Sequence, residues 1–122
     1  MSTVMQVKPE AALAGGSCAG VRVCLAAQVP DGGSHRVELP GRPALAVFNL
    51  DGQIHVTDDR CTHGDASLCD GEIEDGVVEC PYHQGAFDIA TGKPVAAPCS
   101  IPLRVYRSRV DAEGVVYIQL EQ

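Results

Sequence analysis

Two cysteine–histidine pairs lie close together in the chain and have the residue types of a metal site. Cys61 and His63 occur in the stretch CTHG, and Cys80 and His83 occur in CPYHQG, which starts nineteen residues after Cys61. Two thiolates and two imidazoles are ligands that suit zinc or an iron–sulfur cluster. The sequence therefore predicts a metal centre held by these four side chains.

The spacing within each pair favours a centre with two metal ions. Structural zinc sites usually take ligands about two to four residues apart, so that one knuckle chelates one ion. A two-iron cluster has two ends, and a loop with one cysteine and one histidine can give a ligand to each iron. A second such loop then completes two cysteines on one iron and two histidines on the other, which is the Rieske arrangement. A zinc-stabilised interaction module is the alternative from a different functional class.

Short β-strands joined by turns are expected around these pairs. Segments 35–39 (HRVEL) and 53–57 (QIHVT) alternate between polar and apolar residues, as half-buried strands do. Asp51-Gly52 is a strong signal for a hairpin turn between 44–50 and 53–57. No segment shows sustained helical periodicity with capping residues, so we predict an all-β antiparallel sandwich or barrel. The other expected elements are strands at 21–25 and 76–79, a turn at Thr91-Gly92, and a final hairpin of 103–110 with 115–120.

Length and composition indicate one domain, residues 1–122, with an aliphatic core. Aromatic residues make up only 4% of the chain, against a hydrophobic fraction of 45%, so the core must consist mainly of Val, Leu, Ile and Ala. We expect residues 1–19, rich in Ala, Gly and Ser, to be partly disordered. Loops 58–75 and 80–100, which carry the two pairs, are expected to stand on the β scaffold.

The sequence lacks the signals of a membrane or secreted protein. No apolar run approaches the ~20 residues of a membrane span. Lys8, Pro9 and Glu10 lie where a secretory signal needs an uninterrupted apolar stretch. We therefore expect a cytoplasmic protein, and in that reducing compartment six cysteines indicate metal or redox chemistry before disulfides.

The net charge of −7 is concentrated in residues 58–79. This segment holds eight acidic residues and one base, Arg60, whereas the acids and bases of the remaining chain cancel. Nucleic-acid binding is disfavoured because it needs a basic patch. An acidic loop can simply be solvated, or it can face a basic protein partner. The acidic residues are Asp58, Asp59, Asp65, Asp70, Glu72, Glu74, Asp75 and Glu79.

The stretches LDGQIHVTDDRCTHG, CTHGDASL, ECPYHQGAFD and TGKPVAAP carry a resemblance to a known family. Over nearly all of the chain beyond the first twenty residues, it resembles the Rieske ferredoxins, and in particular the ferredoxin component of three-component bacterial aromatic-ring-hydroxylating dioxygenases of the naphthalene and biphenyl type. The resemblance implies an antiparallel β base with a small cluster-binding subdomain of two ligand loops, residues 58–100. It also implies one [2Fe–2S] cluster per chain, held by Cys61, His63, Cys80 and His83.

The resemblance further implies a one-electron carrier with no substrate turnover of its own. An FAD- and NADH-dependent ferredoxin reductase would supply electrons, and a terminal Rieske non-haem iron oxygenase would accept them to activate dioxygen on an aromatic ring. A related alternative is the Rieske-type small subunit of an NAD(P)H nitrite reductase, which is similar in size. Members of that group often lack cluster ligands, and all four are present here.

The residues that flank the ligands predict a low reduction potential. High-potential relatives have a disulfide between the ligand loops, at positions that are Ala66 and Tyr82 here. They also have a serine and a tyrosine that donate hydrogen bonds to cluster sulfurs, at positions that are Gly85 and Phe87 here. Without these donors the reduced cluster is less stabilised. Gly64, like Gly85, is expected to let backbone N–H groups approach the sulfides.

The remaining cysteines have no ligand pattern. We expect Cys24 to be a small buried hydrophobic residue of a strand. Cys18 and Cys99 are expected to be free thiols, and Cys69 does not match the disulfide position of the high-potential relatives. The resemblance implies that the loop ending at Pro98 covers one side of the cluster.

Overall fold

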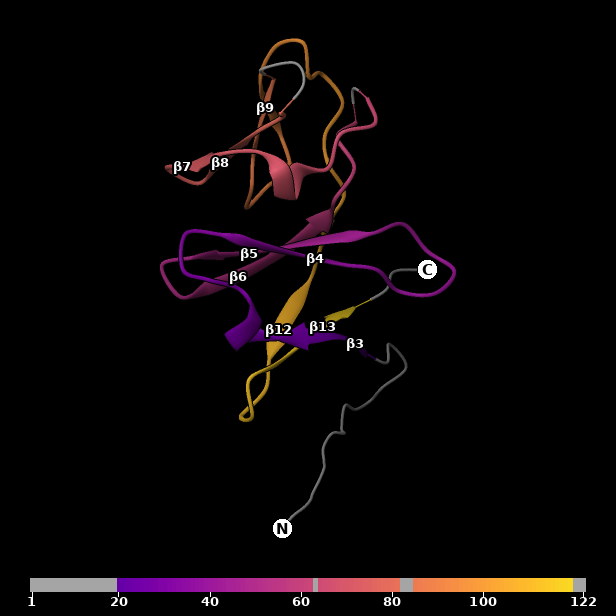
Figure 1. Ribbon diagram of the computed structural model, residues 1–122, viewed down its shortest axis with the longest axis vertical. Helices are drawn as coiled ribbons and strands as arrows, with labels where there is room; N and C mark the ends of the chain where they lie inside the picture. Colours follow the sequence, from indigo (N-terminus) through magenta and orange to yellow (C-terminus); the bar gives the residue numbers. More distant parts are fainter. Residues whose placement is uncertain (1–19, 63, 82–84, 120–122) are drawn as a thin grey trace.

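Three small antiparallel sheets are stacked along the longest axis of the molecule (Figure 1). The computed structural model describes residues 20–62, 64–81 and 85–119. The upper sheet has the strand order β10-β9-β8-β7, the middle sheet β11-β6-β5-β4 and the lower sheet β12-β13-β3. Their bounds are Gly20–Leu25 (β3), Ser34–Val37 (β4), Leu45–Leu50 (β5), Gln53–Asp58 (β6), Ile73–Glu74 (β7), Val77–Glu79 (β8), Ala86–Asp88 (β9), Pro94–Ala96 (β10), Val105–Tyr106 (β11), Ser108–Val110 (β12) and Val115–Gln119 (β13).

The predicted all-β class is confirmed. The helical elements of the described residues are two single 3₁₀ turns, Ala26–Gln28 and Leu68–Asp70. Within these residues, no helix has the length and hydrophobicity needed to cross a bilayer. The expected hairpin between β5 and β6 is present, with Leu50 paired to Gln53. Asp51 and Gly52 have φ values of 54° and 89°, and this left-handed pair is the backbone that a two-residue type I′ hairpin turn requires.

Strand β5 is buried on both faces and therefore joins two hydrophobic cores. Successive side chains of a strand point to opposite faces, so Ala46 and Phe48 face one core while Leu45 and Val47 face the other. Full burial of Phe48 contributes about 1.5–3 kcal/mol to the attachment of the upper sheet. The upper core consists of Ala46, Phe48, Cys61, Ala66, Leu68, Val78, Cys80, Phe87, Ile89, Cys99 and Leu103. The lower core consists of Val23, Cys24, Val29, Leu45, Val47, Val56, Tyr106, Val116 and Ile118.

The final hairpin differs from its prediction, because the expected strand 103–110 is two strands in two sheets. β11 pairs with β6 in the middle sheet, whereas β12 pairs with β13 in the lower sheet. The change occurs at Arg107, whose carbonyl accepts a hydrogen bond from Gln119 N–H at 2.9 Å. Strands that bend from one sheet into another form the corners of stacked sheets, so this segment links the two lower layers. The last expected strand residue, Leu120, lies outside the described residues, as do residues 1–19 with their predicted disorder.

Loops are predicted at 58–75 and 80–100, on either side of a strand at 76–79 that is confirmed as β8, but these two segments also contribute strands to a sheet of their own. β7 and β8 form one hairpin, and β9 joins β8 to β10. These strands are two or three residues long and lie at the top of Figure 1, above the middle sheet. The expected turn at Thr91-Gly92 is present, with Gly92 N–H donating to Asp88 O at 2.7 Å. Short strands of this kind cannot position a site by pairing alone, so their loop contacts decide its geometry.

Candidate metal centre

The two cysteines of the predicted centre occupy equivalent places in two similar hairpins. Cys61 N–H donates to the carbonyl of Ala66 at 2.9 Å, and Cys80 N–H donates to the carbonyl of Gly85 at 2.7 Å. Each bond closes a loop onto the residue five positions further on. The flanking residues are also paired in the same way, as Arg60↔Ser67 and Glu79↔Ala86. The second hairpin therefore repeats the backbone pairing of the first, nineteen residues later.

The predicted ligands His63 and His83 lie outside the described residues. In the sequence, His63 falls between the bonded residues Cys61 and Ala66, and His83 falls between Cys80 and Gly85. Each backbone-closed loop therefore contains one cysteine at its base and one histidine within it. The role of the two histidines as ligands stays a prediction.

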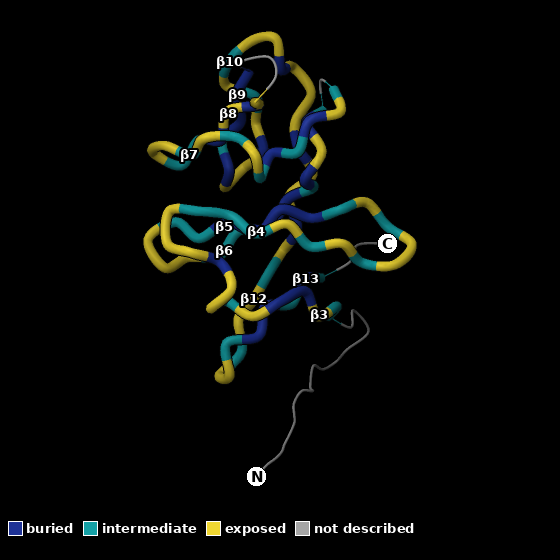
Figure 2. Tube along the Cα trace, in the orientation of Figure 1, coloured by how far each residue is buried: buried dark blue, intermediate teal, exposed yellow. Residues whose placement is uncertain are grey.

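Cys61 and Cys80 are both buried in the upper core. Each residue has a relative exposure of 1%, and both pack in the same cluster as Phe87. Figure 2 shows buried segments of the chain, in dark blue, in this upper part of the molecule. A buried thiolate needs a compensating charge, which an iron ion supplies. The pair therefore offers two soft ligands from neighbouring hairpins in a site shielded from water.

Asp59 anchors the first loop to the sheets below it. Its carboxylate is 2% exposed and accepts hydrogen bonds from Cys69 N–H and Arg36 Nε, each at 3.1 Å. Its main chain adds two more contacts, since Asp59 N–H donates to Ala44 O at 3.0 Å and Leu68 N–H donates to Asp59 O at 2.8 Å. One residue thus fixes both ends of the first hairpin, two positions before Cys61.

The start of the second hairpin is held by a close backbone approach to the segment that follows the first hairpin. Glu79 N–H donates to Glu72 O at 2.8 Å, just before Cys80. A Cβ atom at Gly71 would lie 1.9 Å from the carbonyl oxygen of Glu79, so only glycine fits between the 3₁₀ turn and β8. The φ of Gly71 is −87°, which shows that space rather than backbone conformation requires glycine here.

A third cysteine, Cys99, is a free thiol, as predicted, and lies beside the first predicted ligand. The Sγ atoms of Cys99 and Cys61 are 3.8 Å apart, and Cys99 is 5% exposed. Burial, followed by the hydrogen bond and charge of Cys61 and the charge of Cys80, raises the pKa of Cys99 to about 12. The available signal was its position directly after Pro98, in the loop that the resemblance placed against the cluster.

The other predictions near the centre have mixed outcomes. Cys24 is buried in β3, as predicted, and burial raises its pKa. Cys69 is a half-buried free thiol, and desolvation is the largest cause that raises its pKa to about 12. Gly64 N–H donates to Cys61 O at 3.3 Å, a contact within the protein backbone. Gly85 packs directly against the sulfur of Cys99, and Cys18 lies outside the described residues.

With this geometry in hand, comparison with known proteins identifies the family. Residues 19–107 match the family model of the Rieske [2Fe-2S] domain. The chain belongs to the Rieske [2Fe–2S] family. A Rieske domain carries a [2Fe–2S] cluster, and the buried Cys61 and Cys80 fit that cofactor because thiolates are the ligands that iron–sulfur clusters require.

Similar Rieske proteins include ferredoxins. Ferredoxin CarAc of Metapseudomonas resinovorans is 42% identical over 84% of this chain and 94% of its own length. The Sphingomonas yanoikuyae B1 ferredoxin is 45% identical, with a TM-score of 0.80 over 84% of this chain and all of that one. A ferredoxin solved in a complex of reduced oxygenase and oxidized ferredoxin in carbazole 1,9a-dioxygenase is 42% identical, with a TM-score of 0.78.

A nitrite reductase small subunit from Mycobacterium tuberculosis shares the fold of this Rieske chain. Its TM-score is 0.74, but only 22% of the residues are identical. At that level of identity the similarity concerns the fold alone. The ferredoxins are therefore the nearer relatives of the two groups considered from the sequence.

Proposed function

We propose that this Rieske protein is the ferredoxin of an aromatic-ring dioxygenase system and carries single electrons to its terminal oxygenase. The observation that carries the proposal is the similarity along 84% of the chain to ferredoxins, one of them solved in complex with an oxygenase. In this role the chain is an electron-transfer component and not an enzyme.

The proposed ligand set is Cys61 and Cys80 on one iron, with His63 and His83 on the other. Three observations support the cysteines: both are buried, both belong to the upper core, and both stand at the base of equivalent closed loops. The histidines are proposed from their places within those loops in the sequence. When bound, the [2Fe–2S] cluster supplies a one-electron redox couple whose potential responds to charge, hydrogen bonds and solvent exposure.

A potential near the lower end of the Rieske range is proposed for this chain. Phe87 is fully buried in the upper core and presents a ring without a hydroxyl group. Gly85 has no side chain to donate either. The low end of the range, about −150 mV, suits electron supply from a flavoprotein. We propose an FAD- and NADH-dependent ferredoxin reductase as that donor.

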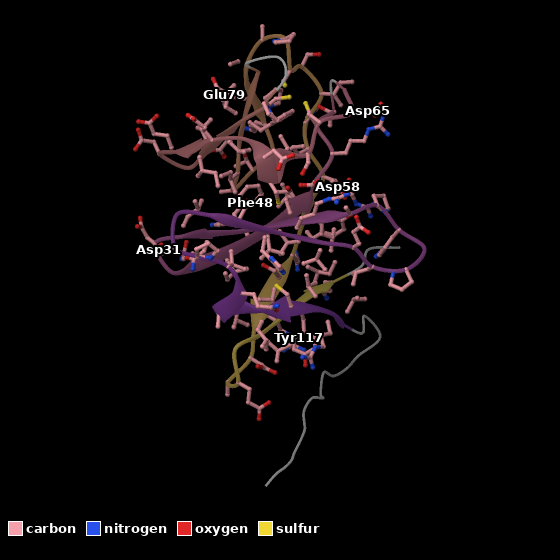
Figure 3. All side chains as sticks on the ribbon, in the orientation of Figure 1. Asp31, Phe48, Asp58, Asp65, Glu79 and Tyr117 are labelled. Atoms are coloured by element: carbon pink, nitrogen blue, oxygen red, sulfur yellow. The ribbon has the colours of Figure 1, made fainter. Side chains whose placement is uncertain are left out.

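The acidic segment divides into structural and surface carboxylates. Asp58 and Asp59 are engaged inside the protein, by Tyr106 Oη and by Arg36. The other six acids of residues 58–79 are exposed, and Figure 3 shows Asp65 and Glu79 on the upper part of the molecule. We propose that these exposed acids steer basic docking faces of the two partners. Such steering weakens with salt, because the Debye length is about 8–10 Å at moderate ionic strength.

An EPR-monitored redox titration of the anaerobically purified protein is the first test. We expect a reduced-state signal with the low average g-value of histidine-ligated clusters, titrating near the bottom of the Rieske range. Reduction of the same sample by NADH and a dioxygenase-system reductase, followed by oxidation on adding the oxygenase, then tests the role. A high potential would contradict the proposed donor, and a colourless protein with one zinc per chain would contradict the electron-carrier function.

A nitrite reductase small subunit would behave differently in the second step. It would remain reduced in the presence of the oxygenase and would associate with a sirohaem reductase instead.

Measuring electron-transfer rates over a series of salt concentrations tests the proposed steering by the acidic residues. The rate with each partner should fall as ionic strength rises. Rates that do not change with salt for both partners would contradict the steering proposal while leaving the redox assignment intact.

A further inference from the structure

Cys99 occupies a position between the two ligand hairpins. Its sulfur lies 3.8 Å from Cys61 Sγ of the first hairpin. It also fills the space above Gly85 of the second, where a Cβ atom would come within 2.3 Å of Cys99 Sγ. Gly85 is the residue whose carbonyl closes the Cys80 loop. The third thiol is therefore packed against both loops that hold the predicted ligands.

Several hydrogen bonds hold Cys99 in this place. Cys99 N–H donates to Ala96 O at 3.2 Å, which closes a turn around Pro98. Thr62 Oγ1, in the first ligand loop, donates to Ile101 O at 2.6 Å and ties that loop to the segment after Cys99. Leu103 N–H donates to Gly92 O at 2.8 Å. The position of the thiol is thus set by the chain on both sides of it.

The direction of the contact follows from the chemistry of an iron ligand. A cysteine binds iron as a thiolate and has no proton to give. Between Cys61 and Cys99, the proton must therefore lie on Cys99, whose S–H group donates the hydrogen bond that Cys61 Sγ accepts. A separation of 3.8 Å is also far longer than the ~2.05 Å of a disulfide bond. At 5% exposure, water competes little for the same sulfur.

We propose that Cys99 is a positioning and tuning residue, whose S–H group donates a hydrogen bond to Cys61 Sγ and raises the reduction potential of the cluster. This inference rests on the proposed role of Cys61 as an iron ligand. A donor to a ligand sulfur stabilises the state with more negative charge, which is the reduced state. Cys99 thus partly replaces the donors that Gly85 and Phe87 do not provide.

The test compares the midpoint potentials of the wild-type protein, Cys99→Ala and Cys99→Ser. We expect Cys99→Ala to lower the ratio of reduced to oxidised protein at a fixed potential by about three- to tenfold, the effect of one ordinary hydrogen bond. A tenfold change corresponds to about 59 mV for a one-electron couple. Cys99→Ser keeps a donor and should restore a potential clearly above that of Cys99→Ala. Cys24→Ala removes a buried thiol of the lower core and should leave the potential unchanged.

An infrared measurement keeps the inference testable if Cys99→Ala fails to retain its cluster. The S–H stretching band that is present in the wild type and absent from Cys99→Ser should shift to lower frequency on reduction, because the accepting sulfur becomes more electron-rich. Equal potentials in the wild type and Cys99→Ala would overturn the proposal. The proposal would also be overturned if the potential fell equally in both Cys99 variants, because the effect would then come from packing and not from a hydrogen bond. An S–H band that does not shift on reduction would overturn it as well.

Failure of the ligand assignment gives a different result. If Cys61 is not a ligand, Cys61→Ala keeps the Rieske EPR signal. If only the tuning role of Cys99 is wrong, Cys61→Ala loses that signal while Cys99→Ala keeps the wild-type potential. The two hypotheses are therefore separated by one pair of variants.

Discussion

The cluster-binding region, residues 58–100, and the β base, formed by β3–β6 and β11–β13, are stabilised in different ways. The base has strands of up to six residues and a core of mainly aliphatic side chains. The strands of the cluster-binding region have two or three residues, and its core includes three cysteines. The base can therefore form from strand pairing and hydrophobic burial, whereas the upper region depends on a few anchoring contacts and on metal ligation.

Loss of a cluster ligand should have the largest effect, which is loss of the cluster. This effect should be confined to the cluster-binding region. We expect Cys80→Ala to abolish the visible absorbance and the Rieske EPR signal, because one iron loses one of its two proposed thiolate ligands. Cys24→Ala is the matched control, since it removes another buried thiol, from β3 of the base. Absorbance and EPR spectra of both variants measure the difference.

Retention of a normal Rieske spectrum by Cys80→Ala would show that the ligand set is wrong. Loss of the spectrum in Cys24→Ala as well would show that the two regions are not independent. The control should cost only about 1 kcal/mol of stability, the scale for removing one methyl-sized group from a core.

The next largest effect, on the stability of the cluster-binding region, is expected where Gly71 approaches Glu79 at the start of the second ligand hairpin. Gly71→Ala places a Cβ atom 1.9 Å from Glu79 O, so the 3₁₀ turn and β8 must separate. We expect a loss of about 3 kcal/mol, the upper end for forcing extra volume into a packed site. Gly20→Ala in β3 is the control, because its Cβ would meet its nearest neighbour, Tyr117 Cβ, at 3.4 Å, which is ordinary van der Waals contact. Thermal unfolding followed by cluster absorbance and by far-UV circular dichroism would measure both.

In Gly71→Ala, the absorbance transition should precede the circular dichroism transition. The cluster-binding region would then lose order before the base. Coincident transitions at the wild-type temperature would mean that the close approach between Gly71 and Glu79 is not a constraint on the fold.

The two ion pairs at the first ligand loop should contribute very different amounts to the stability of the protein. Asp59→Asn removes the charge that pairs with Arg36 from a carboxylate that is 2% exposed, and we expect a cost of about 1.5 kcal/mol. Asp65→Asn removes a pair with Arg60 whose side chains are 73% and 85% exposed, so its cost should lie within about 0–1 kcal/mol. Denaturant unfolding of the holoprotein measures both. An equal cost for the two variants would remove Asp59 as the specific anchor of this loop.

A smaller loss of stability than that of Asp59→Asn is expected at Tyr106, where the base meets the upper region. Tyr106 Oη donates to Asp58 Oδ1 at 2.6 Å, and burial together with this bond raises the pKa of Tyr106 from 10.0 to about 12. A raised pKa in the folded state means that the stabilisation is complete below pH 10 and is lost as the pH rises toward 12. We expect Tyr106→Phe to cost about 1 kcal/mol at neutral pH. The Tm difference from wild type should shrink above pH 10, and a constant difference up to pH 12 would contradict this account.

Local pattern was sufficient for most of the base. The alternation in HRVEL and QIHVT and the Asp51-Gly52 turn predicted β4, β5 and β6, because strand periodicity and left-handed turn residues are properties of neighbouring positions. The same pattern was misleading at Arg107. Leu103 to Val110 has the composition of one strand, and only its two different partners, β6 and β13, divide it.

The types and spacing of Cys61, His63, Cys80 and His83 favour an iron–sulfur cluster over zinc, and the match to the Rieske family model agrees with that prediction. The residues that surround the centre become known only from the packing of the folded chain. Cys99 comes within 3.8 Å of Cys61 across thirty-eight positions of chain, through turns and loop contacts that no local pattern encodes. The physical reason is that ligand types are local properties of the chain, whereas the contacts that tune a ligand arise when separate segments pack together.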